Sequence, residues 1–196
     1  MKLILAIAGI LLAALFTVLI HYGLFADMTL TEKTSDPIYL VYESHLGDYS
    51  KTPQVINKVF FTLLMIDSIK TNRGFGIYFD NPEFTPKEKL RWVAGSILEE
   101  KDSSLIPLIR EKFNVIRLES EPIAETTFEY KGRLSVIMGI YKAYPVIGTY
   151  IRERELGSLA TMEIYDQPGK VIRYRILKST RFEQFSPVNP WPTELK

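Results

Sequence analysis

The chain has 196 residues, of which 46% are apolar, enough for one domain with a hydrophobic core or for one domain and an appendage. Its 24 Lys and Arg residues nearly balance 23 Asp and Glu residues, and no basic run stands out, so we expect no nucleic-acid partner. Cysteine is absent from the sequence, which excludes disulfides, thiolate metal sites and cysteine nucleophiles. With His21 and His45 as its two histidines, the chain is expected to hold neither a metal ion nor a cofactor.

An uncharged apolar segment, Leu3–Ile20, lies near the start of the chain. As a helix of about 18 residues it would span roughly 27 Å, close to the thickness of the hydrocarbon core of a bilayer. We therefore predict a transmembrane signal-anchor helix over residues 1–25, which makes the lipid bilayer a partner and the protein a single-pass membrane protein. The alternative is a cleaved signal peptide, but the segment is longer than a usual h-region and no A-x-A site follows it. Lys2 slightly favours a cytoplasmic N-terminus, and the sequence leaves open which side of the membrane carries the rest.

The next part of the chain reads as a linker followed by strand, helix, strand, strand. Residues 26–37 are polar and turn-rich and predict a linker that lifts the domain off the bilayer. Runs of β-branched and aromatic residues predict strands, and apolar residues at helical spacing after Thr52 and Pro53 predict a helix. The expected elements are strand 38–44, helix 53–70, strand 74–80 and strand 90–100.

A short helix over 105–113 and an extended connection over 115–122 lead to a second series in the same order. It comprises strand 123–130, helix 134–155, strand 159–166 and strand 171–179. The long helix contains Pro145, near which we expect a break or a kink. The domain is thus expected over residues 38–182, with a short C-terminal tail over 183–196.

Two phrases support an internal duplication: GIYFDNP at residues 76–82 and EIYDQP at residues 163–168. Each closes the first strand after a long helix, so Tyr78 and Tyr165 occupy equivalent places. The one clear difference is Gly76 in the first copy against Glu163 in the second. We predict an α+β fold: a tandem duplicated βαββ (SHS2-like) antiparallel sheet with helices on one face.

Several segments, in order along the chain, resemble a known family. They are His45-x-Gly47-x-Tyr49, Tyr78 with Asp80-Asn81-Pro82, Val93–Leu98, Thr149–Arg154 and Glu163–Tyr165. The soluble part resembles the GyrI-like small-molecule-binding domain, and with the leading apolar segment it is similar to the membrane-anchored branch of testis-expressed ER-phagy receptor proteins. That branch works through a long disordered tail with an aromatic-x-x-aliphatic motif. Here Trp191 is followed by Glu194 at the aliphatic position, so we expect no recruiting tail.

The candidate site follows from strand alternation. In residues 159–166, Met162 and Ile164 are expected to face the helices, which leaves Glu163 and Tyr165 on the helix-free face. With Tyr78 from the other copy they would line a groove between the repeats. Trp92 and Tyr174 are further candidates for its walls. The resemblance implies that Glu163 is the central glutamate of a site with aromatic walls.

Three hypotheses about function remain open. The first is binding of a small molecule or a protein partner in the inter-repeat groove, without chemistry; a carboxylate among rings suits a cation. The second is a hydrolase with Glu163 as the catalytic base and Tyr165 or Tyr78 as the orienting group. The third is an ER-phagy-type adaptor that acts through its surface. Each competes with the simpler possibility that Glu163 is an exposed residue on a solvated sheet.

Overall fold

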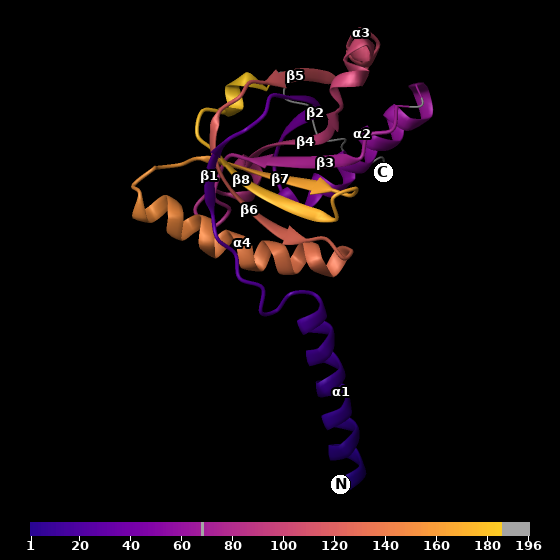
Figure 1. Ribbon diagram of the computed structural model, residues 1–196, viewed down its shortest axis with the longest axis vertical. Coiled ribbons are helices and arrows are strands. Elements are labelled where there is room, and N and C mark those ends of the chain that lie inside the picture. Colours follow the sequence, from indigo (N-terminus) through magenta and orange to yellow (C-terminus); the bar gives the residue numbers. More distant parts are fainter. Residues whose placement is uncertain (68, 186–196) are drawn as a thin grey trace.

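The structure, a computed structural model, describes residues 1–67 and 69–185. A long N-terminal helix leads into an antiparallel sheet of eight strands, with helices packed on it (Figure 1). The helices are α1 (Lys2–His21), α2 (Thr52–Asp67), α3 (Ile106–Ile109) and α4 (Arg133–Glu153). The strands are β1 (Thr31–Thr34), β2 (Ile38–Leu46), β3 (Arg73–Tyr78), β4 (Arg91–Leu98), β5 (Asn114–Leu118), β6 (Pro122–Glu129), β7 (Ala160–Asp166) and β8 (Val171–Leu177). This confirms the predicted α+β class.

The strand order is β1-β6-β8-β7-β3-β4-β2-β5. The two predicted repeats are β2-α2-β3-β4 and β6-α4-β7-β8, and their six strands are arranged symmetrically about the β7–β3 pair. The register places Gly76 of β3 directly opposite Glu163 of β7. The two residues that the sequence comparison made equivalent are therefore neighbours at the centre of the sheet, an arrangement compatible with a duplicated βαββ unit.

Both edge strands were missed by the sequence prediction. Residues 31–34, expected as linker, form β1 and pair with β6. Asn114–Leu118 overlaps the expected extended connection, forms β5 and pairs with β2. Ala26, Met28 and Leu30 pack against the apolar cluster under α4. The chain between α1 and the sheet is therefore attached to the domain and does not hold it away as a free linker would.

The helices α2 and α4 cover the same face of the sheet, as predicted. Val55 and Val59 of α2 pack with Trp92 of β4, and Ala143 and Ile147 of α4 pack with residues of β6 and β8. The helix α4 runs without interruption through Pro145, which lies on its exposed side. The predicted helix over 105–113 is shorter in the structure: a 3₁₀ turn over Glu100–Leu105 leads into α3.

The opposite face of the sheet is also buried. Phe75 of β3 and Ile164 of β7 belong to a second core that includes Phe185. The Phe185 ring contacts Tyr42 edge to face, with ring centroids 5.2 Å apart. The expected tail over 183–196 therefore begins within the core. Trp191 and Glu194, on which the prediction about the tail rests, lie outside the described residues.

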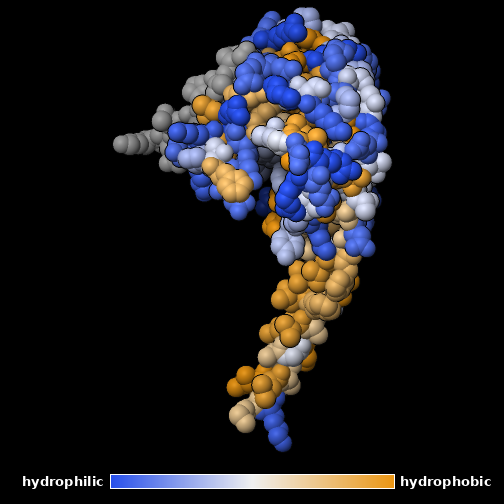
Figure 2. All heavy atoms as spheres, turned by 90° about the vertical axis from the view of Figure 1, so that its left-hand side faces the viewer, coloured by the Kyte–Doolittle hydropathy of each residue, from blue (hydrophilic) through white to orange (hydrophobic). Residues whose placement is uncertain are grey.

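The helix α1 carries apolar side chains on all sides and none of its residues is buried. Figure 2 shows this hydrophobic surface gathered below the mixed surface of the domain. By length and composition α1 could cross a membrane, although a signal sequence would meet the same criteria. The helix α4 also meets them, but it packs on the sheet.

Candidate functional site

Glu163 and Tyr165 lie on the face of the sheet that the helices cover, so the prediction that they face away from the helices is wrong. The hydroxyl of Tyr144, on α4, donates a hydrogen bond to Glu163 at 2.8 Å. Met162 and Ile164 instead belong to the core on the opposite face. Alternation along β7 predicts that neighbouring side chains point to opposite faces of the sheet. Because both faces are buried, it does not predict which of them the helices cover.

The Glu163 carboxylate is buried and held by two phenols. Only 2% of the surface of Glu163 is exposed. One oxygen accepts the bond from Tyr144, and the other accepts from the Tyr165 hydroxyl at 2.5 Å. Within the described part of the chain, no Lys, Arg or His side chain pairs with it. Burial raises the pKa of Glu163, and the two hydrogen bonds only partly oppose this.

Tyr78 brings the first repeat to the same site. A Cβ atom built on Gly76 would lie 2.7 Å from the Tyr78 hydroxyl, so the glycine leaves the space that this phenol fills. Burial and the nearby charge of Glu163 raise the pKa of both Tyr78 and Tyr165 well above the ordinary value. These phenols therefore stay protonated at neutral pH and act as hydrogen-bond donors. The structure thus brings Tyr78 and Tyr165 to Glu163; whether they bind a ligand stays a prediction.

Tyr174 lies directly beside Glu163, as its cross-strand partner on β8. Its side chain is fully buried, and its hydroxyl has no hydrogen-bond partner among the residues the structure describes. The ring contacts Tyr144 edge to face, with centroids 6.4 Å apart. Above it, α4 carries Gly139, where a Cβ atom would overlap the Tyr174 hydroxyl. A buried hydroxyl without a partner is a group that a bound ligand could satisfy.

Trp92 is not brought to the carboxylate. It lies on β4, two strands from β7, in the core beneath α2. Its ring stacks on His45, with centroids 4.7 Å apart and planes inclined by 29°. Sequence reasoning instead missed Tyr144. Its position in the predicted long helix, next to Ala143 and four residues after Ile140, indicates a helical residue close to the apolar face. Helical spacing alone does not predict which strand residue such a side chain contacts.

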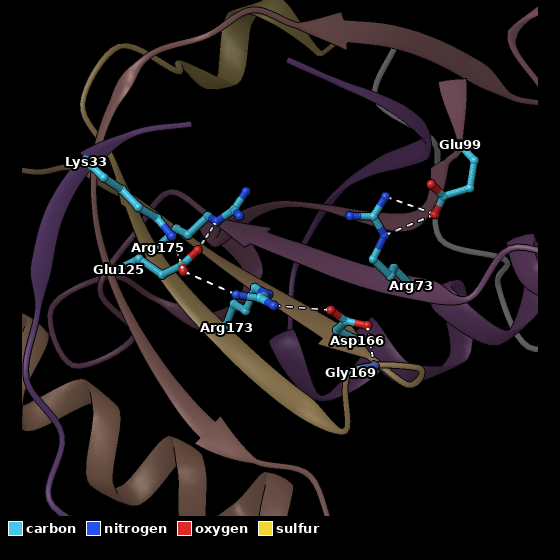
Figure 3. Close-up of polar contacts among 8 residues, drawn as sticks. All are labelled: Lys33, Arg73, Glu99, Glu125, Asp166, Gly169, Arg173 and Arg175. Carbon is cyan, nitrogen blue, oxygen red and sulfur yellow. Dashed lines mark hydrogen bonds and ion pairs between the residues drawn. The ribbon is translucent and has the colours of Figure 1, made fainter. Parts of the chain in front are cut away.

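Two other buried glutamates are paired with cations. Glu43 accepts from Lys58 at 2.6 Å and lies 3.3 Å from His45. Burial alone would raise the pKa of Glu43, but these two partners bring it below the ordinary value. On the helix-free face, Glu125 is held in the same way. It contacts Lys33 at 2.6 Å, Arg175 at 2.5 Å and Arg173 at 3.5 Å (Figure 3).

Figure 3 shows that Arg173 links Glu125 to Asp166, and that Arg73 and Glu99 form a separate pair. Arg173 also contacts Asp166 at 3.4 Å, and Arg73 contacts Glu99 at 2.9 Å. Burial would raise the pKa of Glu125, but Lys33 and Arg175 bring it below the ordinary value. Each of these three carboxylates is paired with a cation of the same domain, so the ion pairs need no ligand to explain them.

Glu121 is buried and has no cation partner among the described residues, but its role is structural. It accepts from the backbone N–H of Ser179 at 2.5 Å and from the hydroxyl of Thr180. Both donors belong to the loop after β8, which the carboxylate fixes to the start of β6. Glu163 differs because its donors are phenols of a helix and a strand, beside a buried hydroxyl that has no partner.

Two curated proteins are similar in sequence to this chain. Human testis-expressed protein 264 is 31% identical over 173 residues, which cover 82% of this chain and 53% of that protein. Its mouse homologue is 34% identical over 137 residues, which cover 66% of this chain and 42% of that protein. The chain thus spans about half the length of the curated relatives it matches. No protein-family model matches it.

A solved structure that shares the fold covers most of the chain. The cryo-EM structure of an EcmrR–DNA complex superimposes with a TM-score of 0.52 and 10% identity, covering 90% of this chain and 68% of that one. Identity this low shows a common fold and nothing about ligands. The chain is therefore homologous to testis-expressed protein 264 over most of its own length, and it shares its fold with the matched part of the EcmrR chain.

Proposed function

We propose that this protein is a single-pass membrane protein whose domain binds a small organic cation at Glu163. One observation carries the proposal: a buried carboxylate at the junction of the two repeats has phenol hydroxyls and no cation around it within the described residues. Isolation of a carboxylate from water is unfavourable unless an opposite charge joins it. A cationic ligand would supply that charge, and the ring faces of the tyrosines would contact it favourably.

In the proposed binding event, the phenols are displaced from the carboxylate. Tyr144 and Tyr165 now occupy one carboxylate oxygen each, and neither residue as a whole is fully buried. A ligand entering between the repeats would turn one or both rings aside and place its charge next to Glu163. The freed hydroxyls, and that of Tyr174, would then donate to or accept from polar groups of the ligand.

The arrangement supports binding better than hydrolysis. A general base needs a free oxygen within reach of the proton that it removes. In the ligand-free protein both oxygens of Glu163 accept from phenols that stay protonated because their pKa values are raised, so binding needs only that these rings move, whereas hydrolysis would need a proton transfer as well. The hydrolase and the adaptor therefore stay predictions. The homology to testis-expressed protein 264 covers about half of that protein, so it supports the domain more than any activity of the whole relative.

The binding test uses the full chain in detergent micelles or nanodiscs. A panel of hydrophobic cations is screened by thermal shift, with benzyltrimethylammonium and its neutral isostere neopentylbenzene as a matched pair. A cation present at about 100 times its Kd should stabilise the domain by roughly 2.7 kcal/mol. The neutral isostere and the Glu163→Gln variant should show no comparable shift. Equal responses of wild type and variant would overturn the assignment of Glu163.

The anchoring is tested independently of any ligand. We expect the full chain to stay with membranes during alkaline carbonate extraction and to keep its N-terminal residues. Release into the supernatant together with loss of the first residues would identify α1 as a cleaved signal sequence. In that case the proposed site could still be tested on the mature protein.

A further inference from the structure

The helix α4 has a second apolar face, turned away from the sheet. Its inner face packs against the domain through small and apolar residues such as Gly139 and Ala143. On the outside, large apolar side chains recur at helical spacing; Ile137 is 63% exposed and Tyr141 is 71% exposed. Leu134 and Ile140 belong to the same exposed face. The outer face of a helix on a soluble domain is normally polar, so this surface indicates a partner.

The charged residues of α4 before its last turn are basic, and Glu129, in the strand before α4, pairs with Lys131 at 2.9 Å. From Tyr130 to Ile151 the sequence contains no Asp or Glu, while Lys131, Arg133 and Lys142 lie along the same stretch. A helix with basic residues beside a large apolar face has the composition of one that lies in the headgroup region of a membrane. Anionic lipid headgroups would complement its charge.

The position of α4 next to α1 indicates which surface covers it. The ammonium group of Lys131 donates to the backbone carbonyl oxygen of His21, the last residue of α1, at 3.0 Å. Just beyond it, a Cβ atom on Gly23 would lie 2.7 Å from the ring of Phe128. Figure 1 shows α4 lying across the end of α1, on the side of the domain from which α1 extends, with the sheet on its other side.

We propose that the outer face of α4 lies in the headgroup region of the same bilayer that α1 crosses. This inference rests on the proposed anchoring by α1. With 20 residues, α1 is about 30 Å long, so a helix that spans the hydrocarbon core ends at its boundary. Contact with His21 then places Lys131 among the headgroups. The apolar side chains at 137 and 141 enter the outer acyl region, while Arg133 binds anionic lipid.

The natural chain has no cysteine, so single cysteines can be labelled one at a time. The full chain is placed in vesicles of phosphatidylcholine with phosphatidylserine, with an environment-sensitive fluorophore on Ile137→Cys. Leu108→Cys is the matched control, because it is also an exposed apolar residue on a helix but lies on α3, at the end of the domain away from α1 (Figure 1). Leu12→Cys, within α1, reports on anchoring.

We expect lipids with a nitroxide near the headgroup to quench the label at 137, and lipids with a deep nitroxide to quench the label at 12. The label at 108 should be quenched by neither. Exchange of phosphatidylserine for phosphatidylcholine, or an added Arg133→Glu substitution, should reduce quenching at 137 and leave quenching at 12 unchanged.

Each of the other outcomes would overturn one part of the proposal. Quenching at 12 with the label at 137 as unaffected as the label at 108 would reject the membrane contact of α4 and leave the anchor intact. A label at 137 that is shielded from water but insensitive to nitroxide lipids would mean that a second copy or another protein covers the face. Absence of quenching at 12 would reject the anchoring itself.

Discussion

The close packing of α4 over Tyr174 makes one glycine substitution sharply testable. Replacement of Gly139 by alanine adds a methyl group that would overlap the Tyr174 hydroxyl and lie 3.2 Å from the Phe128 ring. In a helix interior, alanine is otherwise favoured over glycine by about 1 kcal/mol. Overpacking of a well-filled core costs about 1–3 kcal/mol. The sum predicts that Gly139→Ala is destabilised by about 0–2 kcal/mol.

Gly148, on the same helix, is the matched control. No atom lies within 4 Å of a Cβ atom built there, so Gly148→Ala should show only the gain of about 1 kcal/mol. The two variants should thus differ by about 1–3 kcal/mol in free energy of unfolding. The measurement is urea unfolding of the full chain in micelles, followed by circular dichroism. Tyr174→Phe removes the hydroxyl that the new methyl group meets, so Gly139→Ala should be better tolerated in that background. Equal stability of the two glycine variants, or no rescue by Tyr174→Phe, would refute this account of the packing.

Three further substitutions test other parts of the structure. Glu163→Gln should stabilise the ligand-free protein at neutral pH, because folding raises the pKa of Glu163. The free energy of unfolding of the wild type then falls as pH rises from the unfolded pKa of about 4.3 through the folded pKa, by about 1.4 kcal/mol for each pH unit between the two. Unfolding measured as a function of pH should show the stability gain of the variant shrinking toward acid, and a gain independent of pH would contradict the prediction. Phe185→Ala should reduce the free energy of unfolding by about 3–5 kcal/mol, because the ring is buried in the core on the helix-free face; a loss under about 1 kcal/mol would exclude Phe185 from the core. Glu125→Gln should reduce the free energy of unfolding by about 3 kcal/mol. This is the lower end of the range for breaking a buried ion pair, because Lys33 is partly hydrated. The loss should persist in high salt, because the contact with Arg175 is buried.

The sequence was sufficient for α2, α4 and the six strands of the two repeats. Helix α2 was predicted from Val59 and Leu63 at helical spacing, and β7 from the alternation around Ile164, because burial imposes a period on each element. The strand β1 has no such signal. All four residues of TEKT are exposed, and the segment is a strand only because β6 offers it backbone partners. Pairing of this kind depends on the rest of the fold and leaves no pattern in the strand itself.

The candidate site was predicted in part, for a related reason. The sequence predicted that one site contains Glu163, Tyr165 and Tyr78, since they belong to equivalent strands that meet at the centre of the sheet. The face that they occupy could not be derived, because Phe185, distant in the sequence, buries the face opposite to the helices. Tyr144 comes from α4, and its contact with Glu163 depends on how the helix is rotated over the sheet.

The register at the centre of the sheet has a consequence for how such a site can arise. Gly76 and Glu163 are equivalent in the two repeats and face each other across β3 and β7, so the pseudo-twofold axis passes between them. In a homodimer of single βαββ units, this pair would consist of two identical residues. Two glycines would provide no charge, and two glutamates, with Cβ atoms about 5 Å apart, would oppose each other's ionisation. Fusion of the two units into one chain removes that restriction. A single carboxylate can then lie next to the axis, and the Tyr78 hydroxyl fills the space that Gly76 leaves beside it.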